Sequence, residues 1–161
     1  MPGIKYFPQD LNLENKITIL RVDLNVPILE KKIQDFTRID LTLPFLKKLI
    51  KKKSKIILLS HLGRPKGKRD PSLSLLPVYN YLKEKINTNV YFYTGEINDE
   101  LKSKCLYLKN SEILLIENIR FFKEETDNDE NFSKKIAELG DVFINDAFSC
   151  SHRKHASIYG I

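Results

Sequence analysis

Arginine is the residue type in this sequence that is best suited to binding a small anion. Only six of the 27 basic residues are arginine, so lysine supplies most of the general surface charge. A guanidinium group holds a carboxylate or a phosphate through two parallel hydrogen bonds, which a lysine ammonium cannot do. Biased codon usage is the alternative explanation, and it predicts incidental positions for Arg21, Arg38, Arg64, Arg69, Arg120 and Arg153.

The elements that would position these side chains alternate between apolar runs and helical patterns. We expect strands at residues 16–26, 55–61, 89–94, 112–118 and 141–147. We expect helices at residues 37–52, 73–87, 97–110 and 129–139, the first in spite of Pro44 and the last capped by Gly140. Residues 121–130 are expected to form a polar loop, and the residues after 147 are expected either to be irregular or to begin another element. This alternation favours an α/β fold, with a mostly parallel sheet flanked by helices.

Polar and basic residues gather where the predicted strands end, which is where ligands bind in open α/β sheets. All three histidines and five of the six arginines lie at these ends or at the adjacent start of a helix. The pattern predicts a cationic cleft at one edge of the sheet, suited to a small polyanion. Its members are Arg21, Asp23, Asn25, Arg38, His61, Arg64, Asn118, Arg120, Asn145, Asp146, His152, Arg153 and His155.

The charge and composition argue against nucleic acid and membranes as partners. The net charge is +6, but the lysines are interspersed with acidic residues. The densest run, residues 51–53, lies at a predicted helix C-terminus, where cations complement the helix dipole. No apolar run is long enough to span a bilayer, and the N-terminus does not resemble a signal peptide. Because Cys105 and Cys150 make neither a disulfide framework nor a metal cluster, we expect a cytoplasmic protein without a metal site.

Four segments resemble the signature motifs of the phosphoglycerate kinase family. Residues 20–27 read LRVDLNVP and fit the family's R-x-D-x-N pattern, and residues 60–67 read SHLGRPKG and fit its loop of that sequence. Residues 115–121 read LIENIRF and fit LLEN-x-RF, and residues 145–157 read NDAFSCSHRKHAS and fit NDAF followed by HRAHAS. The four motifs occur in the family's order and cover nearly the whole chain, which makes the resemblance specific.

The resemblance implies a role for each residue of the predicted cleft. Phosphoryl transfer needs alignment and charge neutralisation more than covalent help, and arginine supplies both. A histidine contributes charge only when protonated, so a neutral, hydrogen-bonded role is the alternative for each histidine. Arg38 resembles the arginine that neutralises the transferring phosphoryl group, and it is the implied catalytic residue. The implied substrate-binding residues are Asp23, Asn25, Arg38, His61, Arg64, Arg120 and Arg153, and the supporting basic patch is Arg21, His152 and His155.

The resemblance also implies the N-terminal, triose-binding domain of a two-domain kinase, with a Rossmann-like three-layer architecture. Residues 1–161 would form this domain incompletely at its C-terminal end, without the domain that binds Mg²⁺ with ADP or ATP. Residues 63–68 (GRPKGK) fall one residue short of a P-loop and lack its Ser or Thr. We expect a monomer that binds 3-phosphoglycerate or 1,3-bisphosphoglycerate but does not transfer the phosphoryl group alone. The alternatives are a non-catalytic phosphosugar-binding module and, less favoured, a basic nucleic-acid-binding domain.

One departure from the family lies beside the predicted cleft. Ser149, Cys150 and Ser151 stand where the family usually has Gly-Thr-Ala. If the first of these positions needs a positive φ, Ser149 would strain the loop and shift Arg153. Lys154 replaces a small residue and would either add charge or face the solvent.

Overall fold

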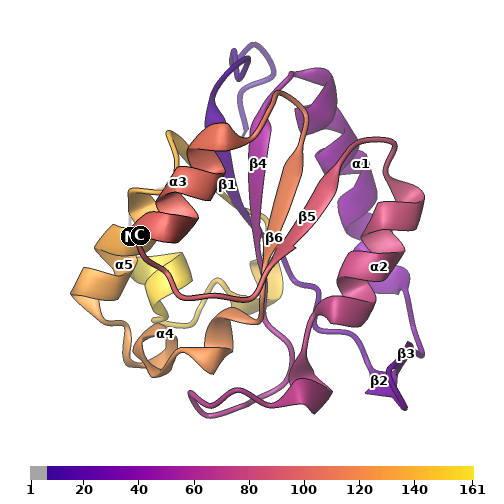
Figure 1. Cartoon of the computed structure of the whole chain (residues 1–161), viewed down its shortest axis with the longest axis vertical. Coiled ribbons are helices and arrows are strands. Elements are labelled where there is room, and N and C mark those ends of the chain that lie inside the picture. The colour runs from indigo at the N-terminus through magenta and orange to yellow at the C-terminus, as the bar shows by residue number, and fades with distance from the viewer. Residues whose placement is uncertain (1–6) are drawn as a thin grey trace.

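Five parallel strands form the central sheet of the computed structural model, which describes residues 7–161. The strand order is β5 (Val90–Tyr93), β6 (Ile113–Ile116), β4 (Lys55–Leu59), β1 (Ile17–Arg21) and β7 (Val142–Asn145). Arg21 pairs with Leu59 on one side and Asn145 on the other, so these three strands end at the same level. Their carboxyl ends point toward the bottom of Figure 1. The predicted parallel α/β fold is confirmed.

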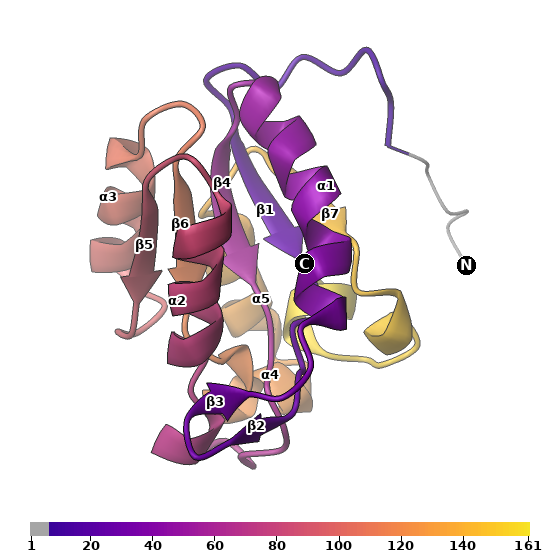
Figure 2. The ribbon, with the colours of Figure 1, turned by 90° about the vertical axis from the view of Figure 1, so that its right-hand side faces the viewer.

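Helices cover both faces of the sheet and make three layers. Figure 2 shows α1 (Thr37–Lys51) and α2 (Leu76–Lys85) in front of the sheet, with α5 (Glu130–Ala137) behind it. Alternate residues of each strand point to opposite faces. Leu20 and Leu58 pack with α1 and α2, whereas Ile19 and Ile57 pack with α5 and α3 (Asp99–Tyr107). The two cores fix the strands, and therefore fix where their ends lie.

The first predicted strand is longer than the observed one. Pairing in the sheet stops at Arg21, although Val22, Leu24 and Val26 remain buried. Asp23 and Asn25, which alternate with them, are half-buried and line a pocket at the ends of the strands. A hairpin that the sequence analysis missed follows, formed by β2 (Ile28–Leu29) and β3 (Lys32–Ile33). Its two turn residues, Glu30 and Lys31, both have positive φ, as a tight hairpin turn requires.

Residues 121–130 are not the polar loop that the sequence predicted. They include the end of a 3₁₀ turn, η2 (Ile119–Phe121), the short helix α4 (Lys123–Asp127) and the start of α5. The charged residues of α4 are exposed except for Glu125, which is fully buried. The residues after β7 also form turns: the 3₁₀ turn η3 (Phe148–Cys150) and the π-helical turn η4 (Ala156–Gly160). Elsewhere, the 3₁₀ turn η1 (Pro71–Leu73) precedes α2.

The sequence predicted that Gly140 caps α5, and this prediction is wrong. The helix ends at Ala137 with Glu138 as its C-cap, and the φ of Gly140 is not positive. A Cβ at position 140 would lie 2.9 Å from the carbonyl oxygen of Ile17 and 2.8 Å from the side chain of Ile19. Glycine is therefore needed here for a close approach to β1 rather than for a helix end. Pro44, by contrast, is accommodated inside α1 as expected.

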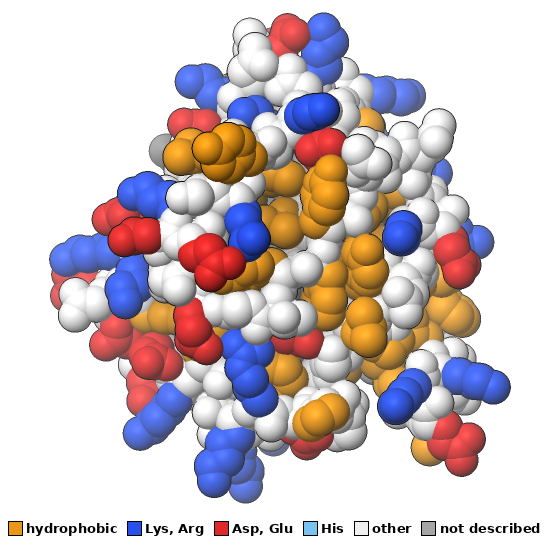
Figure 3. All heavy atoms as spheres, in the orientation of Figure 1, with side chains coloured by type: hydrophobic (Ala, Val, Ile, Leu, Met, Phe, Trp, Pro, Cys, Tyr) orange, Lys and Arg blue, Asp and Glu red, His pale blue; other side chains and the backbone are white. Residues whose placement is uncertain are grey.

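The free edge of the sheet at β5 is apolar and differs in character from the predicted cleft. Figure 3 shows hydrophobic side chains over this edge, bordered by the charged surface of α3. Tyr91 and Tyr107 border a shallow hollow there and are both exposed. Such an apolar surface offers few groups that could bind a polyanion.

No helix in the described part of the chain is long and apolar enough to cross a membrane.

Candidate functional site

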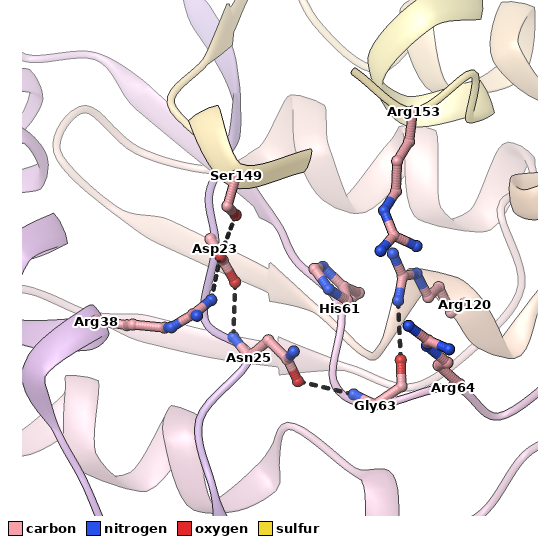
Figure 4. A pocket seen from close by; sticks show the side chains of 9 residues that line it. All are labelled: Asp23, Asn25, Arg38, His61, Gly63, Arg64, Arg120, Ser149 and Arg153. Atoms are coloured by element: carbon pink, nitrogen blue, oxygen red, sulfur yellow. Dashed lines mark hydrogen bonds and ion pairs between the residues drawn. The ribbon is translucent and has the colours of Figure 1, made fainter. Parts of the chain in front are cut away.

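A polar pocket of about 240 Å³ opens at the carboxyl ends of β1, β4, β6 and β7. The seven residues predicted to bind substrate all line it, together with two that were not predicted to do so. The segments that carry them are far apart in the sequence and meet only at this edge of the sheet (Figure 4). The lining residues are Asp23, Asn25, Arg38, His61, Gly63, Arg64, Arg120, Ser149 and Arg153.

Asp23 organises one side of the pocket through its carboxylate. Its Oδ1 accepts the backbone N–H of Asn25 at 3.1 Å. Its Oδ2 accepts hydrogen bonds from the guanidinium of Arg38 and from the hydroxyl of Ser149. Arg38 is half-exposed at the start of α1, so its charge is oriented but still accessible. Among the described residues, Asp23 is the only carboxylate that lines the pocket, and it is already hydrogen-bonded.

The loop after β4 is fixed by hydrogen bonds to its backbone. The side-chain oxygen of Asn25 accepts the N–H of Gly63 at 2.9 Å, and Nη1 of Arg120 donates to the Gly63 carbonyl at 2.9 Å. Asn118 donates to the carbonyl of Leu62 at 2.7 Å. Gly63 has a φ of +60°, and a Cβ there would lie 2.7 Å from the side chain of Leu73. The fixed backbone at Gly63 therefore brings the next residue, Arg64, to the lining of the pocket.

Three arginines make the opposite side of the pocket cationic. Figure 4 shows Arg120 and Arg153 side by side, with Arg64 next to them and His61 between them and Asp23. Arg120 is buried in the η2 turn after β6, whereas Arg64 is exposed. Among the described residues, no carboxylate lies within salt-bridge distance of Arg64 or Arg153. Positive charge in excess of negative charge makes the pocket suited to an anion.

His61 is a neutral group in this cationic site. The side chain is 3% exposed, and its Nδ1 lies 3.0 Å from Nη2 of Arg21. Burial, followed by the charges of Arg21, Arg120 and Arg153, lowers the pKa of His61 to about 2. The imidazole therefore stays unprotonated at pH 7 and contributes a hydrogen bond rather than a charge.

The predicted supporting patch is only partly assembled around the pocket. Arg21 is fully buried behind His61, and it does not line the pocket. His155 borders a neighbouring hollow of about 460 Å³, which Arg64, Arg120 and Arg153 also line. Burial and the nearby arginines lower the pKa of His155 to about 4. His152 is exposed and lines neither hollow, so the structure does not bring it to the site.

Ser149 does not strain its loop. It is not among the residues with positive φ, so serine in place of glycine carries no conformational penalty here. Its hydroxyl instead contacts Asp23 and makes it a pocket residue. The sequence marked Ser149 as unusual but gave no sign of this contact.

No group of three or more His, Cys, Asp or Glu in the described chain is arranged to hold a metal ion.

Comparison with known proteins places these features in one family. The family model for phosphoglycerate kinase matches residues 8–161. The phosphoglycerate kinase of Borreliella burgdorferi is 44% identical over 159 residues, which cover 99% of this chain and 40% of the relative. That of Finegoldia magna is 47% identical over 155 residues, covering 95% of this chain and 39% of the relative. The chain thus spans about 40% of the length of these curated relatives.

Solved structures give the same result. The phosphoglycerate kinase of Coxiella burnetii superposes with a TM-score of 0.85 at 39% identity, over 94% of this chain and 37% of that one. The enzyme from Pyrococcus horikoshii superposes with a TM-score of 0.84 at 30% identity, over 94% of this chain and 39% of that one. The sequence motifs, the fold and the match over nearly all of its length agree, and the chain belongs to the phosphoglycerate kinase family.

Proposed function

We propose that this chain is the triose-binding part of a phosphoglycerate kinase and that the pocket holds 3-phosphoglycerate or 1,3-bisphosphoglycerate. The observation that carries the proposal is the convergence of Arg38, Arg64, Arg120 and Arg153 on one pocket. The carboxylate that lines it in the described chain, Asp23, is already hydrogen-bonded to Arg38 and Ser149. A ligand with two anionic ends fits such a site better than a neutral sugar does.

The arrangement favours one orientation of the triose. Arg64, Arg120 and Arg153 form the more strongly cationic side and would bind the 3-phosphate, which does not react. Asp23 and Asn25, on the other side, present acceptors and an amide to the hydroxyl and the carboxyl end. Arg38 lies beside them at the accessible rim, where it would neutralise charge on the transferring phosphoryl group. The chain's own contribution is thus alignment and charge neutralisation.

The second substrate belongs elsewhere in this proposal. Mg²⁺ with ADP or ATP would bind to a part of the enzyme outside the stretch that this chain shares with its relatives. The reaction is the reversible transfer of a phosphoryl group from 1,3-bisphosphoglycerate to ADP, giving 3-phosphoglycerate and ATP. The chain alone would bind the triose as a monomer and would not turn over. Steady formation of ATP by the pure chain would contradict this part of the proposal.

Calorimetric titration with 3-phosphoglycerate tests the triose site. The native chain should bind saturably, and the Arg38→Ala, Arg64→Ala double variant should lose measurable binding. Arg69→Ala is the matched control, because it removes one guanidinium that contacts Glu96 and lies outside the pocket. Binding that survives in the double variant, or that disappears equally in the control, would refute the assignment.

A further inference from the structure

A buried chain of hydrogen bonds runs from α4 to the pocket. Glu125, Ser157 and Arg21 are fully buried, and His61 is 3% exposed. The Glu125 carboxylate accepts the hydroxyl of Ser157 at 2.7 Å and the backbone N–H of the same residue at 2.8 Å. Nε of Arg21 donates to the Ser157 hydroxyl at 3.1 Å, and Nη2 of Arg21 lies 3.0 Å from Nδ1 of His61.

The hydrogen bonds between these four residues have a fixed direction. A guanidinium group has five N–H donors and no acceptor, so Arg21 must donate to Nδ1 of His61. Nδ1 therefore carries a lone pair, and the proton of the neutral ring must be on Nε2. Ser157 accepts from Arg21, which leaves its single hydroxyl proton for Glu125. Each group in the chain thus has one consistent assignment.

We propose that Arg21, Ser157 and Glu125 are positioning residues that hold His61 as the neutral Nε2–H tautomer at the ligand pocket. Arg21 then acts through His61 instead of binding the anion itself, which differs from its implied role in a basic patch. In the part that concerns the ligand, this inference rests on the proposed function. His61 would recognise the anion by a directed N–H hydrogen bond, whose strength does not depend on protonating the ring.

The groups around these hydrogen bonds agree with a neutral Nε2–H ring for His61. Burial raises the pKa of the Glu125 carboxyl, and the hydrogen bonds from Ser157 and the charges of Arg21 and Arg120 oppose this shift only in part. His155 Nδ1 lies 3.8 Å from the same carboxylate. The low pKa of His61 supports a ring without a second proton. Arg21 is itself held in place, because Nε contacts Ser157, Nη1 donates to the Val22 carbonyl and Nη2 contacts His61.

The first test is a long-range ¹H–¹⁵N spectrum of the histidine rings in the native chain, with no ligand added. His61 is assigned through the loss of its signals in His61→Gln. We expect the Nε2–H pattern for His61, unchanged between pH 8 and pH 5. An Nδ1–H pattern, or a doubly protonated ring at pH 6, would overturn the proposal. This readout is independent of whether 3-phosphoglycerate binds.

The second test separates positioning from mere support of the fold. Ser157→Ala should shift the His61 ring away from the pure Nε2–H pattern and weaken 3-phosphoglycerate binding by roughly fivefold. Ser157→Thr keeps the hydroxyl and should restore both. If Ser157→Ala does not fold, Glu125→Gln replaces one acceptor by a donor and should shift the same ring signals. A folded Ser157→Ala or Glu125→Gln variant with a native His61 pattern would overturn the positioning role.

Failure of the proposed function would look different. A native chain that shows the Nε2–H pattern but does not bind 3-phosphoglycerate would contradict the triose site and leave the tautomer assignment intact. A native chain that binds the triose but shows the other tautomer would do the reverse.

Discussion

The hydroxyl of Ser149 donates a hydrogen bond to the carboxylate of Asp23, although 126 positions separate the two residues in the sequence. The contact ties the turn after β7 to the segment after β1. Arg38 donates to the same oxygen, so Ser149 and Arg38 together fix the orientation of the carboxylate. The family usually has glycine at this position, so serine adds a link between the two walls of the pocket.

Removing this hydroxyl should weaken triose binding. Ser149→Ala loses the hydrogen bond, and the turn that leads to Arg153 is then held less firmly. We expect a dissociation constant for 3-phosphoglycerate about three- to fivefold higher by calorimetry, with Ser149→Thr close to native. In an Asp23→Ala background the same change should have no further effect, because the partner is gone. Additive losses in the double variant would show that Ser149 acts by another route.

A second prediction concerns the charge of the pocket. Asn25→Ala and Asn25→Asp should differ in which property they damage. The alanine variant removes the acceptor of the Gly63 N–H and should lower stability by about 1–2 kcal/mol. The aspartate variant keeps an acceptor but adds a negative charge where an anion must bind, so affinity should fall at least about tenfold. Urea denaturation and calorimetry measure the two effects. An aspartate variant with native affinity would argue against an anionic ligand.

The lowered pKa values of His61 and His155 should make stability fall as the pH falls. Their folded pKa values, about 2 for His61 and about 4 for His155, lie below the ordinary value of 6.5. Below pH 6.5 the unfolded chain therefore binds more protons than the folded chain, at about 1.4 kcal/mol per pH unit for each histidine. His155 ceases to contribute below about pH 4, and His61 below about pH 2.

Urea denaturation between pH 7 and pH 5 measures this effect. We expect a loss of about 2–4 kcal/mol for the native chain and roughly half of that loss for His61→Gln or His155→Gln. Glu125 acts in the opposite sense above its unfolded pKa, because burial raises the pKa of its carboxyl in the fold. The same loss of stability in the native chain and in both variants would mean that these histidines take up protons equally in the folded and unfolded chain.

A fourth prediction tests the close approach at Gly140. Gly140→Ala places a Cβ within 2.9 Å of the backbone of β1 and should destabilise the chain by about 1–3 kcal/mol. Ala137→Ser, at an exposed position in the last turn of α5, should change stability by less than about 0.5 kcal/mol. A Gly140→Ala variant as stable as native would show that glycine is not required there. The measurement is the unfolding midpoint in urea.

The sequence predicted most of the sheet, because buried parallel strands leave continuous apolar runs that need no partner to be recognised. It also predicted that basic residues at the strand ends would meet, and the seven expected pocket residues do line one pocket. The burial of Glu125 could not be predicted, since it depends on Ser157, 32 positions later. Gly63 and Ser149 were missed as pocket residues because their contacts are made through a backbone group and a single hydroxyl.

The late pairing of β1 with β7 has a consequence for how the chain folds during synthesis. β1 ends at Arg21, but its partner β7 begins roughly 120 residues later, and Ser157, which anchors Arg21, comes later still. At ribosomal rates this delay is on the order of ten seconds. Through that interval β1 can pair only with β4. The guanidinium of Arg21 must stay hydrated until Ser157 is available. The pocket therefore cannot be complete until Ser149, Arg153 and Ser157 have been synthesised.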